Sequence, residues 1–196
     1  GEFLIDVQSR FECADGTPVE LGRSNFGFFG VRVAKTISQQ FGGGLLTNAD
    51  GAVGEPAIFG KSSRWVDYSG PSKPGVVEGI AYLDHPSNPH HPTPWHVRID
   101  GWMIAAFNLN EAHGIAVDHP LDLRYRLYIH SGPCDATKNN AEWDSFAATA
   151  PYMFETNRGG NATDSKVTHL GTVCFVPGAN RTDECVSCSC TPQVII

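Results

Sequence analysis

The stretch from Asp84 to Arg98 concentrates residue types that could do chemistry, with four of the eight histidines, a carboxylate, an arginine and a tryptophan. Histidine titrates near neutrality, with an unperturbed pKa of about 6.5, so His85 and His96 could exchange protons with a substrate or bind a metal with Asp84. Arg98 could hold an anionic or hydroxyl-rich substrate, and Trp95 could stack on a sugar ring. The candidate catalytic residues are His85, His96 and Arg98, and the candidate ligand-binding residues are Asp84, His85, Trp95, His96 and Arg98.

The same stretch could instead be a structural brace. It contains four prolines, at positions 86, 89, 92 and 94. Proline lacks a backbone N–H and disfavours helical geometry in the residue before it, which predicts a stiff, extended loop between two strands. In that case Asp84 and the histidines hydrogen-bond the loop backbone. Bracing, ligand binding and catalysis or metal binding therefore all remain open for this loop.

Strands are expected to position the loop. Apolar and β-branched residues predict strands at residues 3–11, 19–21, 26–33, 57–59, 64–68, 77–83, 95–107, 121–130 and 167–176. The cleanest alternation runs from Leu121 to His130, with one face in the core and the other wet or lining a cleft. That second face carries Arg124, Arg126 and His130. One short helix is expected near residues 139–150, after a capping arrangement at Asn139.

Length and charge limit the classes of protein. The 196 residues favour a single β domain over 1–196, with residues 133–196 forming a helix and a disulfide-rich C-terminal extension. The 21 glycines and 13 prolines are scattered between apolar runs, which is typical of an all-β protein with many turns. A net charge of −7 without a cluster of Lys and Arg argues against nucleic acid as a partner. No apolar run approaches the roughly 18 residues of a membrane span, so membrane insertion is not expected.

Six cysteines and two glycosylation sequons point to an oxidising, extracellular setting. The predicted disulfide cysteines are Cys13, Cys134, Cys174, Cys185, Cys188 and Cys190, and the predicted glycosylation sites are Asn161 and Asn180. Six cysteines allow 15 connectivities, so the pairing stays open. A metal knot at residues 185–190 is the alternative, but tetrahedral zinc needs a fourth ligand and no paired motif is near. We therefore predict no metal and no cofactor.

Several motifs in order resemble one bacterial family. They are Gly60-Lys-Ser-Ser-Arg-Trp-Val-Asp-Tyr-Ser-Gly70, Gly79-Ile-Ala81, Asp84-His-Pro-Ser-Asn88, Pro92-Thr-Pro-Trp-His-Val-Arg98 and Leu123-Arg-Tyr-Arg-Leu127. Together they resemble the PmoA-like (DUF6807) family over roughly Val31 to Gly132. The resemblance implies a twisted antiparallel β-sandwich, similar to sugar-active mutarotase-like folds, and a loose link to carbohydrate metabolism. Family members typically carry a histidine-rich front region, which has no counterpart before Gly30, and the cysteine-rich segment beyond Gly132 is unlike the family.

Three functions follow from these features. The first is a secreted, self-assembling structural protein, a subunit of an extracellular polymer or fibril. It is favoured by the missing front region, the cysteines, the sequons and the apolar end at Val194-Ile-Ile196, which could exchange as a strand between copies of the chain. The second is a carbohydrate-active enzyme that uses the loop at 84–98. The third is a non-catalytic module that binds glycans through the same loop.

Overall fold

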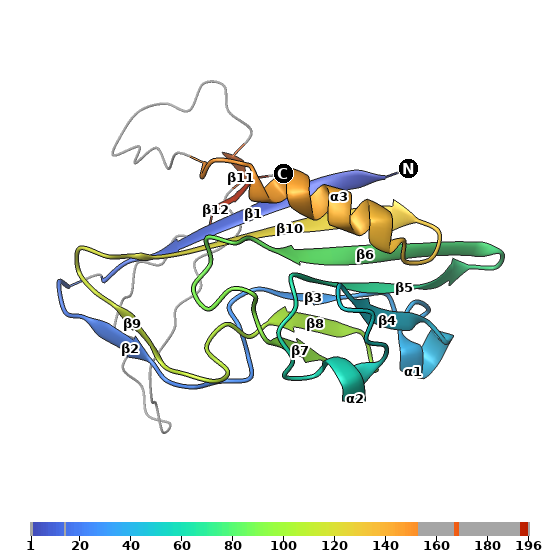
Figure 1. Cartoon of the computed structure of the whole chain (residues 1–196), viewed down its shortest axis with the longest axis horizontal. Helices are drawn as coiled ribbons and strands as arrows, with labels where there is room; N and C mark the ends of the chain where they lie inside the picture. The colour runs from blue at the N-terminus through green and yellow to red at the C-terminus, as the bar shows by residue number, and fades with distance from the viewer. Residues whose placement is uncertain (1, 14, 153–166, 169–192, 196) are drawn as a thin grey trace.

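The computed structural model describes residues 2–13, 15–152, 167–168 and 193–195, and strands are the main regular structure among them (Figure 1). The strands are β1 (Phe3–Phe11), β2 (Val19–Leu21), β3 (Gly30–Arg32), β4 (Leu45–Asn48), β5 (Trp65–Lys73), β6 (Val76–Asp84), β7 (Trp95–Val97), β8 (Trp102–Ala105), β9 (His113–Ile115), β10 (Leu121–Ser131), β11 (Val167–Thr168) and β12 (Gln193–Ile195). The helices are α1 (Gln39–Gly42), α2 (Glu55–Ile58) and α3 (Ala136–Ala147).

The strands form one large sheet and two small ones. The large sheet has the order β11-β12-β1-β10-β6-β5-β4, the second has β3-β8-β7, and β2 pairs with β9. The named strands all pair antiparallel. Figure 1 shows α3 lying over β10 and β6. The predicted fold class, an antiparallel β protein with one short helix near residues 139–150, is confirmed.

The main core contains side chains from both the large sheet and β3-β8-β7. Tyr82 on β6 is at its centre, with its ring centroid 4.9 Å from Trp95 on β7 and 5.3 Å from Tyr125 on β10, both edge-on. All three side chains are at most 1% exposed. Each large buried side chain of this kind stabilises the fold by about 1.5–3 kcal/mol, and edge-on aromatic pairs add to that. The two sheets are therefore joined by aromatic packing.

Three predicted strands differ from the structure, and the one expected at 26–33 is a strand only over β3 (Gly30–Arg32). The long strand expected at 95–107 is instead two strands, β7 and β8, because the chain reverses between them. Gly101 adopts a φ of +111° there, and the Arg98 N–H donates to the Trp102 carbonyl. An Asp-Gly pair at 100–101 favours such a turn. The segment expected as a strand at 57–59 lies mostly in α2.

The helix α3 begins earlier than the sequence indicated. Its N-cap is Asp135, whose Oδ1 accepts from the main-chain N–H groups of Thr137 and Lys138 at 3.0 and 3.2 Å. Asn139 was expected to help cap the helix, but it lies inside α3 and is 1% exposed. The Asn139 side chain makes a buried contact with the sheet, and Asp135, which lies before the first residue of α3, caps the helix.

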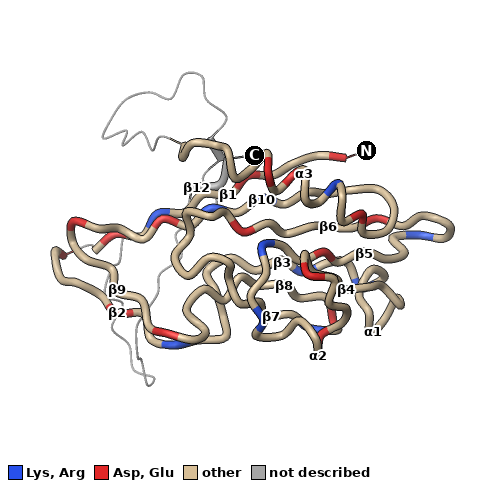
Figure 2. Tube along the Cα trace, viewed as in Figure 1, with Lys and Arg blue, Asp and Glu red and all other residues tan. Residues whose placement is uncertain are grey.

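The features expected to mark a secreted protein fall mostly outside the described residues. Cys13 and Cys134 have free thiols, while the other four cysteines and the sequons at Asn161 and Asn180 lie outside the described residues. Basic and acidic positions are scattered over the described part of the chain (Figure 2). In that part, no helix is long and apolar enough to cross a bilayer.

Candidate functional site

The outer face of β10 lies beneath α3. Arg124, Arg126, Tyr128 and His130 point to this face and are all less than 9% exposed. The ring of Phe146 on α3 is fully buried, and the Arg126 guanidinium lies 4.8 Å from its centroid. The alternation in the sequence correctly separates the core face from this polar face. The polar face is covered by a helix and borders a cleft at one end.

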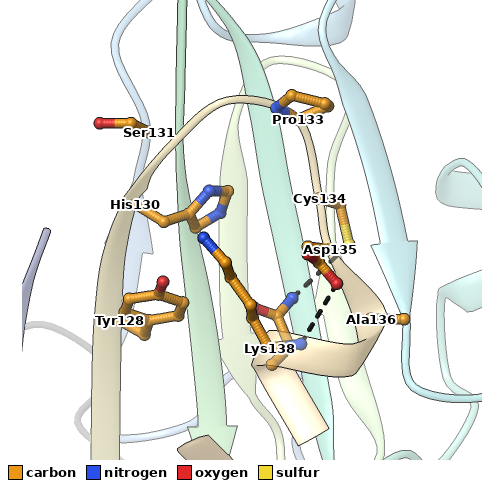
Figure 3. A pocket seen from close by; sticks show the side chains of 9 residues that line it. Tyr128, His130, Ser131, Pro133, Cys134, Asp135, Ala136 and Lys138 are labelled. Carbon is orange, nitrogen blue, oxygen red and sulfur yellow. Dashed lines mark hydrogen bonds between the residues drawn. The ribbon is translucent and has the colours of Figure 1, made fainter. Parts of the chain in front are cut away.

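A pocket of about 420 Å³ lies between the end of β10 and the first turns of α3 (Figure 3). Such a volume suits a small molecule. Most of the lining is polar, and one aromatic ring contributes to it. The lining residues are Tyr128, His130, Ser131, Pro133, Cys134, Asp135, Ala136, Lys138 and Asn139.

His130, which lines the pocket, is paired with a buried carboxylate. His130 Nε2 lies 2.8 Å from Asp67 Oδ2, and the Asn139 side-chain amide donates to the same oxygen at 2.9 Å. Asp67 on β5 is fully buried and His130 is 4% exposed. Burial acts to lower the pKa of His130, but the hydrogen bond and charge of Asp67 outweigh it, so the pKa is raised. The protonated imidazole is therefore more stable here than in an unperturbed histidine.

Gly79 allows this pair to form. His130 on β10 and Ser69 on β5 both pair with Gly79, because β6 lies between their strands. A Cβ atom at Gly79 would lie 2.6 Å from both Cε1 and Nε2 of His130. Real Cβ atoms do not approach other atoms this closely. The missing side chain therefore leaves the space through which the imidazole reaches across β6 to Asp67.

The remaining polar groups of the pocket differ in reactivity. Burial, together with the charge and hydrogen bond of Asp67, raises the pKa of Cys134 to about 12. Its thiol is therefore protonated near neutrality and a poor nucleophile. Asp135 is engaged as the N-cap of α3 through the Thr137 and Lys138 main-chain N–H groups, and Figure 3 draws the bond from Lys138 as a dashed line. The Lys138 ammonium extends over the pocket near His130 (Figure 3).

This arrangement supports proton transfer. With Nε2 committed to Asp67, a carboxylate orients the imidazole and stabilises its charged form, as in known histidine–aspartate pairs. Nucleophilic catalysis by Cys134 is disfavoured by its raised pKa. The chemistry that this pocket supports best is acid–base chemistry on a small polar molecule.

Asp84, predicted as a ligand-binding residue, is fully buried and engaged within its own loop. Its carboxylate accepts from the Asn88 amide at 2.7 Å, from His91 Nδ1 at 2.7 Å and from the Thr93 main-chain N–H at 2.9 Å. The Trp143 indole of α3 donates to the Asp84 carbonyl at 2.8 Å. These contacts match the bracing alternative.

His85 and His96 lie in different surroundings. His85 is 2.8 Å from Arg124 Nη1 and packs edge-on against Phe146, and burial and the Arg124 charge lower its pKa to about 4. His96 donates to the Asn25 carbonyl at 2.8 Å, and burial lowers its pKa. Two phenylalanine rings, Phe26 and Phe59, flank it at 5.0 and 5.1 Å. Both histidines are therefore favoured in the neutral form.

Trp95 and Arg98 complete the predicted set. The Trp95 indole is fully buried and donates to the Ser63 carbonyl at 2.8 Å, so its ring offers no face to a sugar. Arg98 is about half exposed and pairs with Glu55 at 3.2 Å. Within the described residues, no hydrogen bond or ion pair joins any two members of the predicted set. No group of three or more His, Cys, Asp or Glu side chains there is placed to hold a metal ion.

Sequence reasoning placed His130 on a non-core strand face but did not connect it with Asp67, Asn139 or Lys138. The separation of 63 residues between Asp67 and His130 hides the pair unless the strand register is known. One signal was present. Gly79 interrupts a strand that is otherwise rich in apolar residues, and glycine inside a strand often marks a close approach by another group.

The comparisons with known proteins give one match. A family model described as "Family of unknown function (DUF6807)" matches residues 1–144. The match is wider than the expected range of Val31 to Gly132 and includes every residue that lines the pocket. No curated protein and no solved structure matches the chain.

Proposed function

The chain belongs to the DUF6807 family, and from that premise we propose that the pocket beside α3 binds a small hydroxyl-bearing molecule of the carbohydrate class and that His130 exchanges a proton with it. The observation that carries the proposal is the buried Asp67–His130 pair at the wall of a polar pocket. Burying a histidine beside a carboxylate costs solvation energy, and such perturbed titratable groups in clefts are typical of functional sites.

Each polar group has a role in this proposal. His130 is the proton donor and acceptor, and Asp67 keeps its imidazole oriented and favours its charged form. Asn139 donates a second hydrogen bond to the Asp67 oxygen that His130 contacts. Lys138 is placed to hydrogen-bond ligand hydroxyls, and the Tyr128 ring offers a surface against which the apolar face of a sugar can pack.

Binding of monosaccharides to the purified chain tests this proposal. We expect at least one of D-glucose, D-galactose, D-mannose and D-glucuronate to give a saturable isotherm in titration calorimetry. His130→Gln should weaken that binding by about tenfold, since a charge-assisted hydrogen bond is lost. His119→Gln is the matched control, because the His119 side chain is 81% exposed and does not line the pocket.

Two outcomes would contradict the proposal. One is the absence of binding for all four sugars, with the protein shown to be folded by its cooperative thermal unfolding. The other is equal affinity of the wild type and His130→Gln for the sugar that binds.

A second function, self-assembly by strand exchange, is supported by the position of β12. Val194 and Gln193 of β12 pair antiparallel with Val7 and Gln8 of β1, while β11 pairs with the other side of β12. If β12 were absent, the outer edge of β1 would present unpaired main-chain groups at these positions. Such an edge can accept a strand from another copy of the chain.

Deleting residues 191–196 tests strand exchange. If strands exchange, light scattering should show assemblies of the full chain and a folded monomer after the deletion. Adding a synthetic peptide of residues 191–196 to the truncated chain should restore the thermal stability that the deletion removes. Assembly of the truncated chain to the same mass as the full chain would show that β12 is not the connecting strand.

A further inference from the structure

The Glu2 carboxylate contacts two of the residues that line the pocket. Glu2, the residue before β1, accepts a hydrogen bond from the Tyr128 hydroxyl at 2.8 Å through Oε2. Its Oε1 lies 3.4 Å from Lys138 Nζ. Tyr128 and Lys138 both line the pocket, one from β10 and the other from α3. The Glu2 side chain therefore links the two elements between which the pocket lies.

The surroundings of Glu2 favour a negative charge. The Tyr128 hydrogen bond, the Lys138 charge and the main-chain N–H of Ser131 lower the pKa of Glu2. The charge of Glu2 also acts on His130, where it favours the protonated imidazole. Four residues that line the pocket thus interact with one carboxylate.

Glu2 is held loosely compared with the buried carboxylates nearby. Its side chain is 39% exposed, whereas Asp67 is fully buried. Ion pairs at such exposure contribute little to stability, since water and salt screen them. A second carboxylate that reached the same donors could replace Glu2 at small cost.

We infer that the ligand of this pocket carries a carboxylate, as an acidic sugar or a related hydroxy acid does, and that Glu2 occupies the carboxylate position until the ligand displaces it. This inference rests on the proposed function and names the class of ligand. Tyr128, Lys138 and His130 supply two positive groups and one hydroxyl donor on the same pocket, which match a carboxylate better than a neutral hydroxyl. A neutral sugar would leave Glu2 in place and would gain from Lys138 only a hydrogen bond to a hydroxyl, without the charge attraction that a carboxylate adds.

The dissociation constants of D-glucuronate and D-glucose test the inference, since the two sugars differ in one carboxylate. The wild type should bind D-glucuronate about tenfold more tightly than D-glucose. Glu2→Gln should strengthen D-glucuronate binding several-fold and leave D-glucose binding unchanged, because the competing charge is gone. Lys138→Met should remove the preference for D-glucuronate. Glu20→Gln on β2 is the matched control for the loss of one negative charge.

The outcomes separate this inference from the proposed function. If D-glucose binds as tightly as D-glucuronate, or if Glu2→Gln leaves D-glucuronate binding unchanged, the carboxylate assignment is wrong while the sugar pocket stands. If neither sugar binds, nor D-galactose nor D-mannose, both proposals fall. Thermal unfolding of Glu2→Gln within a few degrees of the wild type excludes a general loss of fold as the cause of any change.

Discussion

Asp84→Ala is expected to destabilise the fold by about 3–5 kcal/mol, because it removes the acceptor of three hydrogen bonds in a fully buried position. The Asn88 amide and the Thr93 N–H would each lose a partner in a buried position, and the partly exposed His91 imidazole would lose its carboxylate. Unfolding in urea measures the effect as a lower midpoint at an unchanged slope.

The matched control is Asp118→Ala. The Asp118 carboxylate is 80% exposed and paired with an exposed histidine, so its loss should leave the free energy of unfolding close to that of the wild type. If Asp84→Ala were as mild as this control, Asp84 would not be the brace of the loop at 84–98, and its carboxylate would again be a candidate for binding.

Asp67→Asn is expected to lower the rate of proton transfer by His130 about 10²–10⁴-fold while preserving the shape of the pocket. The amide keeps the size of the carboxylate but loses the charge that raises the pKa of His130. The rate to measure is anomer exchange of the sugar that binds, followed by NMR line shapes or polarimetry. A rate equal to that of the wild type would show that the Asp67–His130 pair takes no part in the reaction.

The same variant should change the pH dependence of stability. His130 has a raised pKa in the folded protein, so its contribution is present below the unfolded pKa of about 6.5 and is lost as pH rises through the folded pKa. In Asp67→Asn, the hydrogen bond and charge of Asp67 no longer oppose burial, so the pKa of the folded-state imidazole falls and the contribution of His130 shrinks. Free energies of unfolding between pH 5 and 8 should therefore show a smaller slope for His130 in this background, obtained by subtracting the profile of His130→Gln in each background.

The strand pattern of β10 could be predicted from the sequence because alternation depends only on neighbouring residues. Leu121, Leu123 and Tyr125 face the core as expected, and Arg124 and His130 face the other side. The partner of His130 could not be predicted, because it depends on the register of three strands and on the space at Gly79. Register follows from packing over the whole sheet and is not written in any one segment.

The loop at 84–98 shows where residue composition alone misleads. Its composition is that of a site, yet Asp84 bonds to its own loop and Trp95 is in the core. Composition cannot tell whether a carboxylate binds a ligand or the neighbouring backbone, since the same donors serve both. The predicted start of α3 was wrong for a similar reason. The Asn139 side chain contacts Asp67, and Asp135 caps the helix instead.

Chemical-shift mapping of the isotope-labelled chain during titration with D-glucuronate and D-glucose would locate the ligand. We expect the changing shifts to cluster at residues 128–139, with that of the His130 imidazole among the largest, and Glu2 to respond to D-glucuronate alone. Saturable changes centred on His96 and Arg98, with residues 128–139 unmoved, would contradict it and return the site to the loop at 84–98.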